Sequence, residues 1–490
     1  MHESAAAPAN LPELPQRWGH PRTLWMLLGV TVGLNFAFYG FRSYLTPYIA
    51  EQFFAHLGGA AAQRQADLLA SGFLALMYAT PILGGYVADK ILGETRALGI
   101  SLWLGVLSLL LMAAPSLAGF ELGLSLFALS AGLGIPLTVL IGRNYAAGDP
   151  RREGGYTLFY LAINLGAFIT PFVCADHIGQ RFGLRWGFVA AAAGMLAAAV
   201  LFQWRKHKLE PVLPKGDHLH GRAATVWTLL AMAALTWPVA ELLAFPLVLR
   251  WAMYVLMGLL VLYFVVGCVR RGERVQTHRY LALLLLFIAL VVFWALSLQG
   301  VTSLNFFARD HVRAPFHYTL FQSANPLYIL LFAPFMAMLW PWLDRKGRDP
   351  STPRKFGIGL LLVALSYGVM AWSIDHAGGD RIAWWPLALC YLLQTVGELA
   401  LSPIGYALVG QLAAPEEVSL AMGGWFFGVA LAYQLAGWVA TLTASGTASA
   451  LAGMAEYGRV YTQLFVWGTV MAVLFLLAAP WIRRLMHGVR

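Results

Sequence analysis

The sequence is a succession of about fourteen apolar stretches of about 20 residues each, separated by short polar links. A helical run of this length spans the hydrocarbon core of a bilayer, where a helix satisfies every backbone polar group internally. Only 11% of the residues are charged, against about 25% in soluble domains, so the chain cannot solvate its surface in water. We therefore expect an all-α membrane protein. The stretches lie at about 23–50, 66–88, 95–116, 119–145, 156–178, 184–204, 224–245, 247–269, 279–308, 320–343, 355–375, 383–412, 418–445 and 459–486.

Two basic links divide these stretches into groups of six, two and six. The longer link, about 205–222, contains Pro211 and Pro214, and the second lies at about 270–279. Two six-helix halves are what a major facilitator fold requires, and the middle pair would be an inserted hairpin. We expect a tail at 1–21, a six-helix bundle at 22–205, a linker with the hairpin at 206–278, and a second six-helix bundle at 279–490.

The distribution of basic residues predicts how the chain is oriented. With the N-terminus in the cytoplasm, about three quarters of the 33 Lys and Arg residues fall in cytoplasmic links, and the opposite orientation inverts this bias. Both termini are therefore expected in the cytoplasm, as in a multi-pass protein of a bacterial inner membrane. Membrane topology explains the net charge of +10, so we expect no nucleic-acid partner.

Several short runs, taken in order along the chain, identify a family. The chain resembles the proton-dependent oligopeptide transporter family from about Tyr39 to Trp438. The runs that carry the resemblance are 84–90 with Gly93 and Arg96, 149–152, 159–166, 293–295 with 299–300, 321–327, 397–399 with 402–405, and 422–423 with 425–426. The resemblance implies a transporter of short peptides that works by alternating access.

Glu398 is the strongest candidate for substrate binding. It lies in the middle of an apolar run, where a carboxyl group costs several kcal/mol unless a cavity or a partner satisfies it. By the resemblance, Glu398 would meet the peptide ammonium, and Asn164 and Asn325 would share that task. The alternatives are a structural carboxyl for Glu398 and interhelical hydrogen bonds for the two asparagines.

The resemblance also assigns residues to the rest of the substrate. Arg42 would lie near the peptide carboxylate, and Tyr39, Tyr78 and Trp425 would line the cavity. An arginine can instead extend to the membrane interface, and an aromatic side chain can simply pack. These alternatives remain open in the sequence.

Another set of residues predicts a gating role. Gly84 and Gly85 would let two helix backbones approach, and Asp89, Lys90 and Arg96 would form a charge cluster that favours one conformation. Pro326 and Pro403 interrupt apolar helices, where a proline frees a carbonyl and kinks the helix. Such kinks serve either as plain bends or as hinges of the cavity.

The chain departs from its family at the charged positions. Thr31, Leu34 and Asn35 occupy the charged positions of the Glu-x-x-Glu-Arg motif, Ile135 stands in place of a lysine, and Leu298 in place of a glutamate. Because all partners are replaced together, no buried charge is stranded. We therefore expect altered or weakened proton coupling, with Glu398 as the clearest remaining proton acceptor and Glu121 and Glu241 as poorer ones. Asp67, Asp176 and Asp310 also lie near the ends of expected helices.

Three classes of function compete for this sequence. The first is a transporter of di- and tripeptides, and the second is a facilitator or exchanger of another amine-bearing solute on the same fold. The third, a receptor or an enzyme, lacks support because no nucleophile with a base and no metal-ligand spacing occurs in the apolar runs. We expect a monomer without enzymatic activity, cofactor or metal, whose partners are the substrate, the lipid bilayer and protons.

Overall fold

The computed structural model of the protein describes residues 15–146, 149–213, 221–414, 417–444 and 450–489. The side chains at 271, 402–404, 406–407, 419 and 450–452 lie outside this description. Within the described chain, 13 helices are long and apolar enough to cross a membrane. The remaining expected segment, 383–412, forms a helix of 29 residues. The all-α membrane class expected from the sequence is confirmed.

The helices form two compact units, and the first unit comprises residues 1–44 and 79–244. Its strands β1 and β2 pair in antiparallel fashion, with Gln16 opposite Pro21 and Arg17 opposite His20. Its elements are β1 (Gln16–Arg17), β2 (His20–Pro21), α1 (Arg22–Arg42), α4 (Pro81–Val87), η2 (Ala88–Leu92), α5 (Glu94–Met112), α6 (Leu117–Gly132), α7 (Pro136–Arg143), α8 (Arg151–Thr170), η3 (Pro171–Gly179), α9 (Gln180–Phe182), α10 (Leu184–Arg205), η4 (Lys206–Val212) and α11 (Arg222–Ala244).

The second unit comprises residues 45–78 and 245–490. Its two short strands are parallel, with Val312 opposite Ile382 and Arg313 opposite Ala383. Its elements are α2 (Leu45–Phe53), η1 (Ala55–Leu57), α3 (Gly59–Ala79), α12 (Pro246–Arg271), α13 (Arg274–Ser297), η5 (Leu298–Gly300), α14 (Ser303–His311), β3 (Val312–Arg313), η6 (Tyr318–Ser323), α15 (Ala324–Arg345), α16 (Thr352–Asp375), β4 (Ile382–Ala383), α17 (Trp384–Leu412), α18 (Val418–Thr441) and α19 (Ala450–Leu485).

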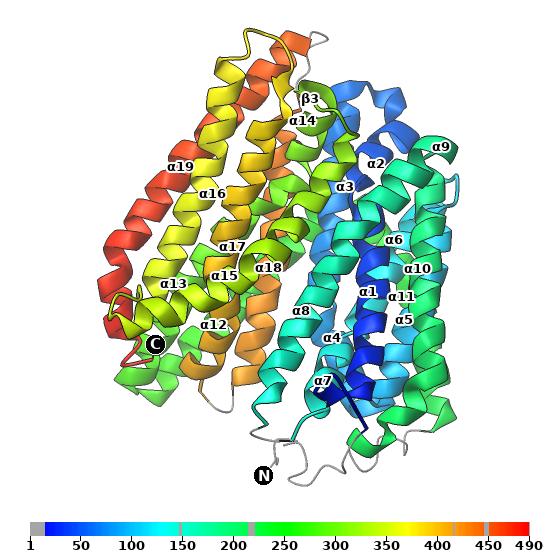
Figure 1. Ribbon diagram of the computed structural model, residues 1–490, viewed down its shortest axis with the longest axis vertical. Coiled ribbons are helices and arrows are strands. Elements are labelled where there is room, and N and C mark those ends of the chain that lie inside the picture. Colours follow the sequence, from blue (N-terminus) through cyan, green and yellow to red (C-terminus); the bar gives the residue numbers. More distant parts are fainter. Residues whose placement is uncertain (1–14, 147–148, 214–220, 415–416, 445–449, 490) are drawn as a thin grey trace. The chain divides into compact units, whose positions relative to one another are not determined.

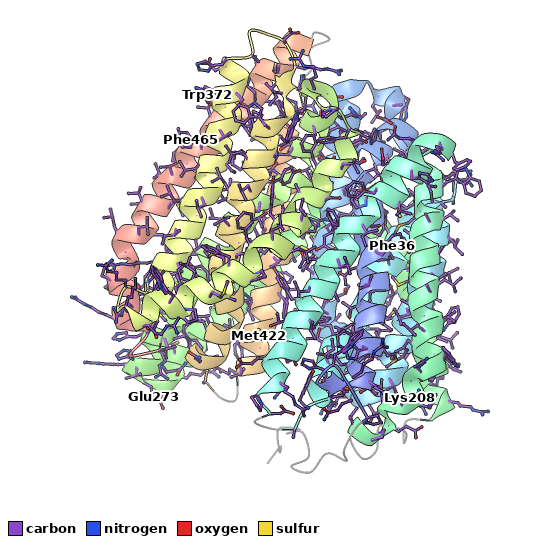
Figure 2. All side chains as sticks on the ribbon, in the orientation of Figure 1. Phe36, Lys208, Glu273, Trp372, Met422 and Phe465 are labelled. Atoms are coloured by element: carbon purple, nitrogen blue, oxygen red, sulfur yellow. The ribbon has the colours of Figure 1, made fainter. Side chains whose placement is uncertain are left out.

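Small residues bring the helices of the first unit together. The helix α1 packs against α8 and α10, and α5 packs against α6 and α10. Phe36 of α1, which is labelled in Figure 2, lies against Gly194 of α10, where a Cβ atom would overlap the phenyl ring. Close approach of this kind is how membrane helices gain packing energy, because lipid provides no hydrophobic force between them.

The second unit is built around α16, which packs along α17 and α19 (Figure 1). Its core contains large aromatic side chains that are almost fully buried, among them Phe293, Tyr367 and Tyr461. The hydroxyl group of Tyr367 donates to the backbone carbonyl of Leu296 at 2.6 Å, so this polar group is satisfied inside the apolar core. The core therefore fixes α13, α16 and α19 relative to one another.

The two inserted helices are divided between the units. The helix α11 packs against α6 in the first unit, and α12 packs against α13 and α18 in the second. Likewise, α3 up to Tyr78 groups with the second unit, whereas α4 packs against α6 in the first. Grouping by packing therefore differs from the grouping by sequence order into 22–205, 206–278 and 279–490.

Candidate substrate-binding site

Glu398 and Asn325 meet inside the second unit, although 73 residues separate them in the sequence. The Asn325 side-chain amide donates to the Glu398 carboxylate at 2.9 Å and to the Thr395 hydroxyl at 3.0 Å. Asn325 lies in the first turn of α15, and Thr395 and Glu398 lie one turn apart on α17, so the three groups share one side of the contact between these helices. Glu398 itself is half-buried.

Thr395 is a member of this polar group that the sequence analysis did not single out. Its side chain is fully buried, and its hydroxyl also donates to the backbone carbonyl of Tyr391 at 2.7 Å. The spacing of three residues before Glu398 was the only signal in the sequence, since i and i+3 lie on one helix face. Asn325 is held by its bond to Thr395 and directs its other bond at the Glu398 carboxylate, so the carboxylate has a positioned neighbour, as recognition of a cation requires.

Arg42 and Tyr39 meet at the end of α1 in the first unit. The Arg42 guanidinium lies 5.1 Å from the Tyr39 ring centroid and 5.8 Å from that of Phe38. These are cation–π distances, which stabilise a guanidinium that is partly removed from water. Arg42 is half-buried, and it therefore keeps part of its charge accessible to a partner.

The other expected cavity residues have well-defined neighbours. The buried Asn164 donates its amide to the backbone carbonyl of Tyr160, one turn earlier on α8, at 2.9 Å. Tyr78 lies half-buried at the end of α3, with its ring centroid 5.3 Å from that of Tyr433 on α18.

Trp425 on α18 is only 3% exposed and meets Phe356 edge-on with 6.3 Å between ring centroids. It lines an apolar cavity of about 300 Å³ together with side chains of α12 and α13, including Leu260 and Phe264. These surroundings favour the packing interpretation of Trp425 over direct contact with a polar substrate.

Gly84 is placed where a side chain cannot fit. It lies on α4 against Gly132 of α6, and a Cβ atom at Gly84 would lie 2.7 Å from the Cα atom of Gly132 and closer still to its carbonyl group. A Cβ atom at the next residue, Gly85, would meet nothing within 4 Å. The two glycines that the sequence treats alike therefore differ, and only Gly84 sets the distance between helices.

Gly84→Ala is expected to lower the free energy of unfolding by about 1–3 kcal/mol, because the added methyl group meets backbone atoms that cannot rotate away. Gly85→Ala is the matched control and should change stability little. Thermal unfolding of both purified variants in detergent measures the difference. Equal stability of the two variants would contradict the close approach of α4 and α6.

In the region of the charge cluster expected from Asp89, Lys90 and Arg96, the structure contains an ion pair between Glu94 and Arg143. Asp89 and Lys90 have exposed side chains, whereas Glu94 and Arg143 form a buried bidentate ion pair. The Arg143 Nε atom lies 2.9 and 2.8 Å from the two Glu94 carboxylate oxygens. Glu94 begins α5 and Arg143 ends α7, so each charge also lies at the helix end whose dipole it complements. This pair joins the two helices at the end where Arg96 also lies.

The two prolines assigned to gating lie in different settings. Pro326 is buried in the first turn of α15, directly after the 3₁₀ helix η6. In that turn a missing backbone N–H costs no helical hydrogen bond, so Pro326 marks a change of helix type, and the prolines in the interior of α15 are Pro334 and Pro341. The side chain of Pro403 lies outside the described residues.

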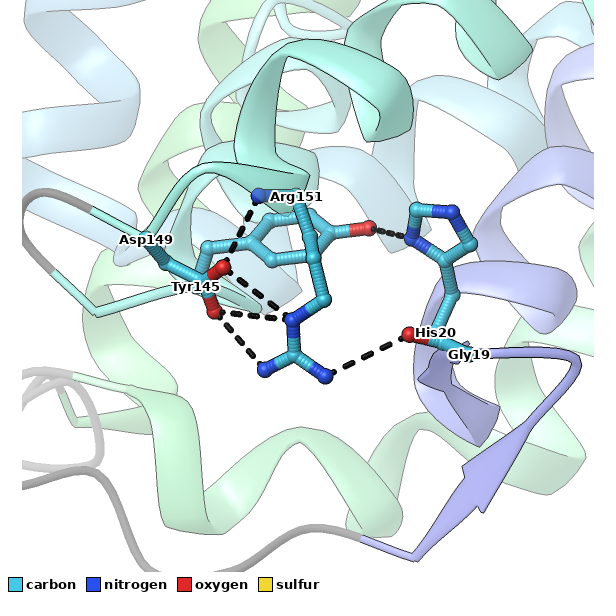
Figure 3. A network of polar contacts seen from close by, with 5 residues as sticks. All are labelled: Gly19, His20, Tyr145, Asp149 and Arg151. Atoms are coloured by element: carbon cyan, nitrogen blue, oxygen red, sulfur yellow. Dashed lines mark hydrogen bonds and ion pairs between the residues drawn. The ribbon is translucent and has the colours of Figure 1, made fainter.

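A second polar network joins the N-terminal strands to the start of α8 (Figure 3). The Asp149 carboxylate accepts from the backbone N–H of Arg151 at 2.9 Å and pairs with its guanidinium at 2.8 Å. Arg151 also donates to the Gly19 carbonyl at 3.3 Å, and the Tyr145 hydroxyl lies 2.7 Å from Nδ1 of His20. The hydrogen bonds from Arg151 lower the pKa of Asp149, and burial raises the pKa of Tyr145 to about 12. The run 149–152 therefore caps α8 and fastens it to the segment before α1.

Comparison with protein families and characterised relatives identifies what this arrangement resembles. The model of the POT family matches residues 97–460. A peptide transporter of Yersinia enterocolitica is 31% identical over 96% of this chain and 96% of its own. A dipeptide and tripeptide permease of Aeromonas hydrophila is 29% identical over 96% of this chain and 94% of its own.

Solved structures agree in fold. A peptide transporter crystallised with alafosfalin superposes with a TM-score of 0.81 at 30% identity, covering 97% of this chain and 98% of that one. A POT family transporter in complex with 5-aminolevulinic acid gives a TM-score of 0.80 at 27% identity, covering 96% and 99%. The likeness confirms the major facilitator fold expected from the sequence.

Proposed function

Because the chain belongs to the POT family of membrane transporters, we propose that it carries di- and tripeptides across the membrane by alternating access. The observation that carries the proposal is the contact between Asn325 and Glu398, a carboxylate positioned between the helices α15 and α17. Relatives described as peptide transporters and as permeases of di- and tripeptides support the same substrate class.

Glu398 has the chemistry to bind the amino group of a peptide. A carboxylate that is partly removed from water gains more from an ammonium than an exposed one does, because the local dielectric is lower. Asn325 donates a hydrogen bond to this carboxylate and is itself bonded to Thr395. Because Glu398 is only half-buried, its carboxylate can also be reached by a substrate. A peptide ammonium would add a positive charge to this polar group.

Arg42 would bind the opposite end of the peptide. Its guanidinium offers planar, paired donors that match a carboxylate, and the neighbouring Tyr39 ring orients it. Asn164 would help to bind the amino group, and Tyr78 would supply a hydrogen bond to the peptide backbone. Apolar side chains around the bound peptide would then tolerate substrate side chains of different size.

Uptake into proteoliposomes tests the proposal. Purified protein should move labelled dipeptides or tripeptides into vesicles, and unlabelled peptide in excess should compete. Protein-free vesicles and vesicles containing the Glu398→Gln variant serve as controls. Failure to move any short peptide, together with uptake of a simple amine, would overturn the peptide assignment.

A second candidate function is the exchange of another amine-bearing solute. The related transporter solved with 5-aminolevulinic acid shows that this fold accommodates an amine that is not a peptide. In this chain Ile135 stands at the position of the family's fourth-helix lysine, which removes one cation from the carboxylate end of the site. Competition between a labelled dipeptide and 5-aminolevulinic acid in the same vesicles distinguishes the two functions.

Proton coupling is expected to be weaker than the family name implies. Thr31, Leu34 and Asn35 cannot titrate, and Leu298 has replaced a glutamate. An inward proton gradient should therefore raise the initial rate of peptide uptake only slightly, and exchange without a gradient should persist. Strong accumulation of peptide against its gradient, abolished by a proton ionophore, would contradict weak coupling.

The bias of Lys and Arg toward one set of links supports a position in the bacterial inner membrane with both termini in the cytoplasm. We expect the transporting unit to be a monomer. Reporter fusions at each terminus test the orientation, and cross-linking in the membrane tests the oligomeric state.

A further inference from the structure

Asp67 is a buried acid that the proposed substrate site does not use. It lies on α3, its side chain is 0% exposed, and neither carboxylate oxygen has a hydrogen-bond partner among the described residues. Two other acids of the second unit, Asp310 and Glu51, each form an ion pair with Arg309. Asp67 therefore differs from these two acids, because its carboxylate is buried without a cation or a hydrogen-bond donor among the described residues.

The helix α3 contacts α18 along the stretch that contains Asp67. The two helices run antiparallel, because Gln63 reaches Thr443 at 3.5 Å and Tyr78 meets Tyr433. Between these points Gly437 lies so close to α3 that a Cβ atom would be 2.5 Å from Cβ of Ser71 and 3.2 Å from the Asp67 carbonyl oxygen. This register brings the fully buried Ala440 level with Asp67. The residues of α18 at this level of the contact, Gly437 and Ala440, are thus small and apolar.

The titratable groups around this contact are few, and none is a cation held against Asp67 in the described structure. Tyr457 on α19 lies within electrostatic range of Asp67, and its hydroxyl accepts from the Gln63 amide at 3.0 Å. Beyond Tyr457 lie His311, with 5.4 Å between the ring centroids, and Asp310, which is paired with Arg309. The tyrosine separates Asp67 from these charged groups of α14.

An ionised carboxylate in such a place is unfavourable. Burial without a partner costs the charged form several kcal/mol, whereas the protonated acid carries no net charge to desolvate. Asp67 lies eight residues from the start of α3, or about 12 Å along the helix axis at 1.5 Å per residue. When α3 and α18 separate, water from that end of the helix can reach the carboxyl group and accept its proton.

We propose that Asp67 is a proton-binding site that controls the contact between α3 and α18. A proton from water binds the carboxylate when the helices are apart, the neutral acid allows them to close, and the proton returns to water when they open again. The pH on that side of the membrane then sets how readily the contact closes. The effect of this switch on transport rests on the proposed function, whereas proton binding itself does not.

Infrared difference spectroscopy of Asp67→Asn against the wild-type protein tests proton binding directly. At neutral pH the wild-type spectrum should contain a protonated-carboxyl stretch that the variant lacks, because asparagine keeps the shape but has no acid. Asp310→Asn is the matched control and should keep this band, since Asp310 is paired with Arg309. Identical carboxyl bands in wild type and Asp67→Asn would overturn the proposal.

Stability across pH supplies a second measurement. Where the folded protein holds one proton that the unfolded chain releases, stability falls as pH rises, and the unfolding equilibrium constant should increase about tenfold per pH unit. The difference between wild type and Asp67→Asn between pH 5 and pH 8 isolates this contribution. A constant difference over that range would contradict a proton held at Asp67.

Peptide exchange without a proton gradient shows whether the switch acts on transport. The wild-type rate should vary with pH, and the Asp67→Asn rate should stay nearly constant over the same range. If both proteins respond equally to pH, the control of transport by Asp67 is wrong. If the wild-type protein moves no peptide at any pH, the proposed function fails, and the spectra and stability still decide whether Asp67 binds a proton.

Discussion

Glu398→Gln is expected to reduce peptide uptake by roughly 10- to 100-fold at low substrate concentration. The substitution keeps an oxygen that can accept the hydrogen bond from the Asn325 amide, so α15 and α17 should stay together. It removes the negative charge, and a hydrogen bond to a charged group contributes about 1.5–3 kcal/mol. The loss should appear mainly as a higher KM, because the ammonium binds before the helices rearrange.

Initial rates of labelled dipeptide uptake over a range of concentrations measure this effect. Glu456→Gln is a matched control, because Glu456 lies on α19 in the same unit but forms a partly exposed ion pair with Arg459. The control should transport like the wild-type protein. A Glu398→Gln variant with unchanged KM and rate would remove Glu398 from the substrate site and leave it a structural role.

Arg143→Gln is expected to lower the free energy of unfolding by about 3–5 kcal/mol, because it leaves the Glu94 carboxylate buried without its cation. The side chains of Arg143 and Glu94 are only 14% and 7% exposed, so water cannot replace the lost partner. Thermal and denaturant unfolding in detergent should both detect the change. The variant should give a lower yield of folded protein, whereas the transport rate per folded molecule should change less.

Two further variants test whether the loss of stability in Arg143→Gln comes from an unpaired buried charge or from a general loss of contacts. Glu94→Gln combined with Arg143→Gln should recover most of the stability, because neither residue then carries an unpaired buried charge. Arg151→Gln should cost less than about 1 kcal/mol, since the pair between Arg151 and Asp149 is largely solvated on the arginine side. A double variant as unstable as Arg143→Gln alone would contradict the electrostatic explanation.

The residues that the sequence singled out fall into two groups in the structure, one of polar contacts and one of packing contacts. In the first group polar side chains meet, since Glu398 contacts Asn325 and Arg42 lies against Tyr39. The buried Trp425 packs against Phe356, and of the two glycines only Gly84 lies against a neighbouring helix. A motif shows that a residue type is required at a position, but it does not show whether the requirement is packing or binding.

Three features were not foreseen at the level of residues. These are the ion pair of Glu94 with Arg143, the fastening of α8 by Asp149 and Arg151, and the burial of the Asp67 carboxylate without a hydrogen-bond partner among the described residues. The first joins residues that are 49 apart in the sequence. Glu94 and Arg143 are charged residues near helix ends like many others, so the sequence does not show that they pair. Asp67 could be judged only by what surrounds it, and α18 and α19 come from the far end of the chain.

The sequence by itself determined that the chain crosses a membrane many times and belongs to a transporter fold, because length, hydropathy and local motifs are properties of contiguous residues. The tertiary structure decided which face of each helix is buried and which polar groups meet. In a membrane, lipid and protein core are both apolar, so hydrophobic periodicity does not reveal the rotation of a helix about its axis. The partners of Glu398 and Arg143, and the apolar burial of Asp67, follow from that rotation and from contacts between distant helices.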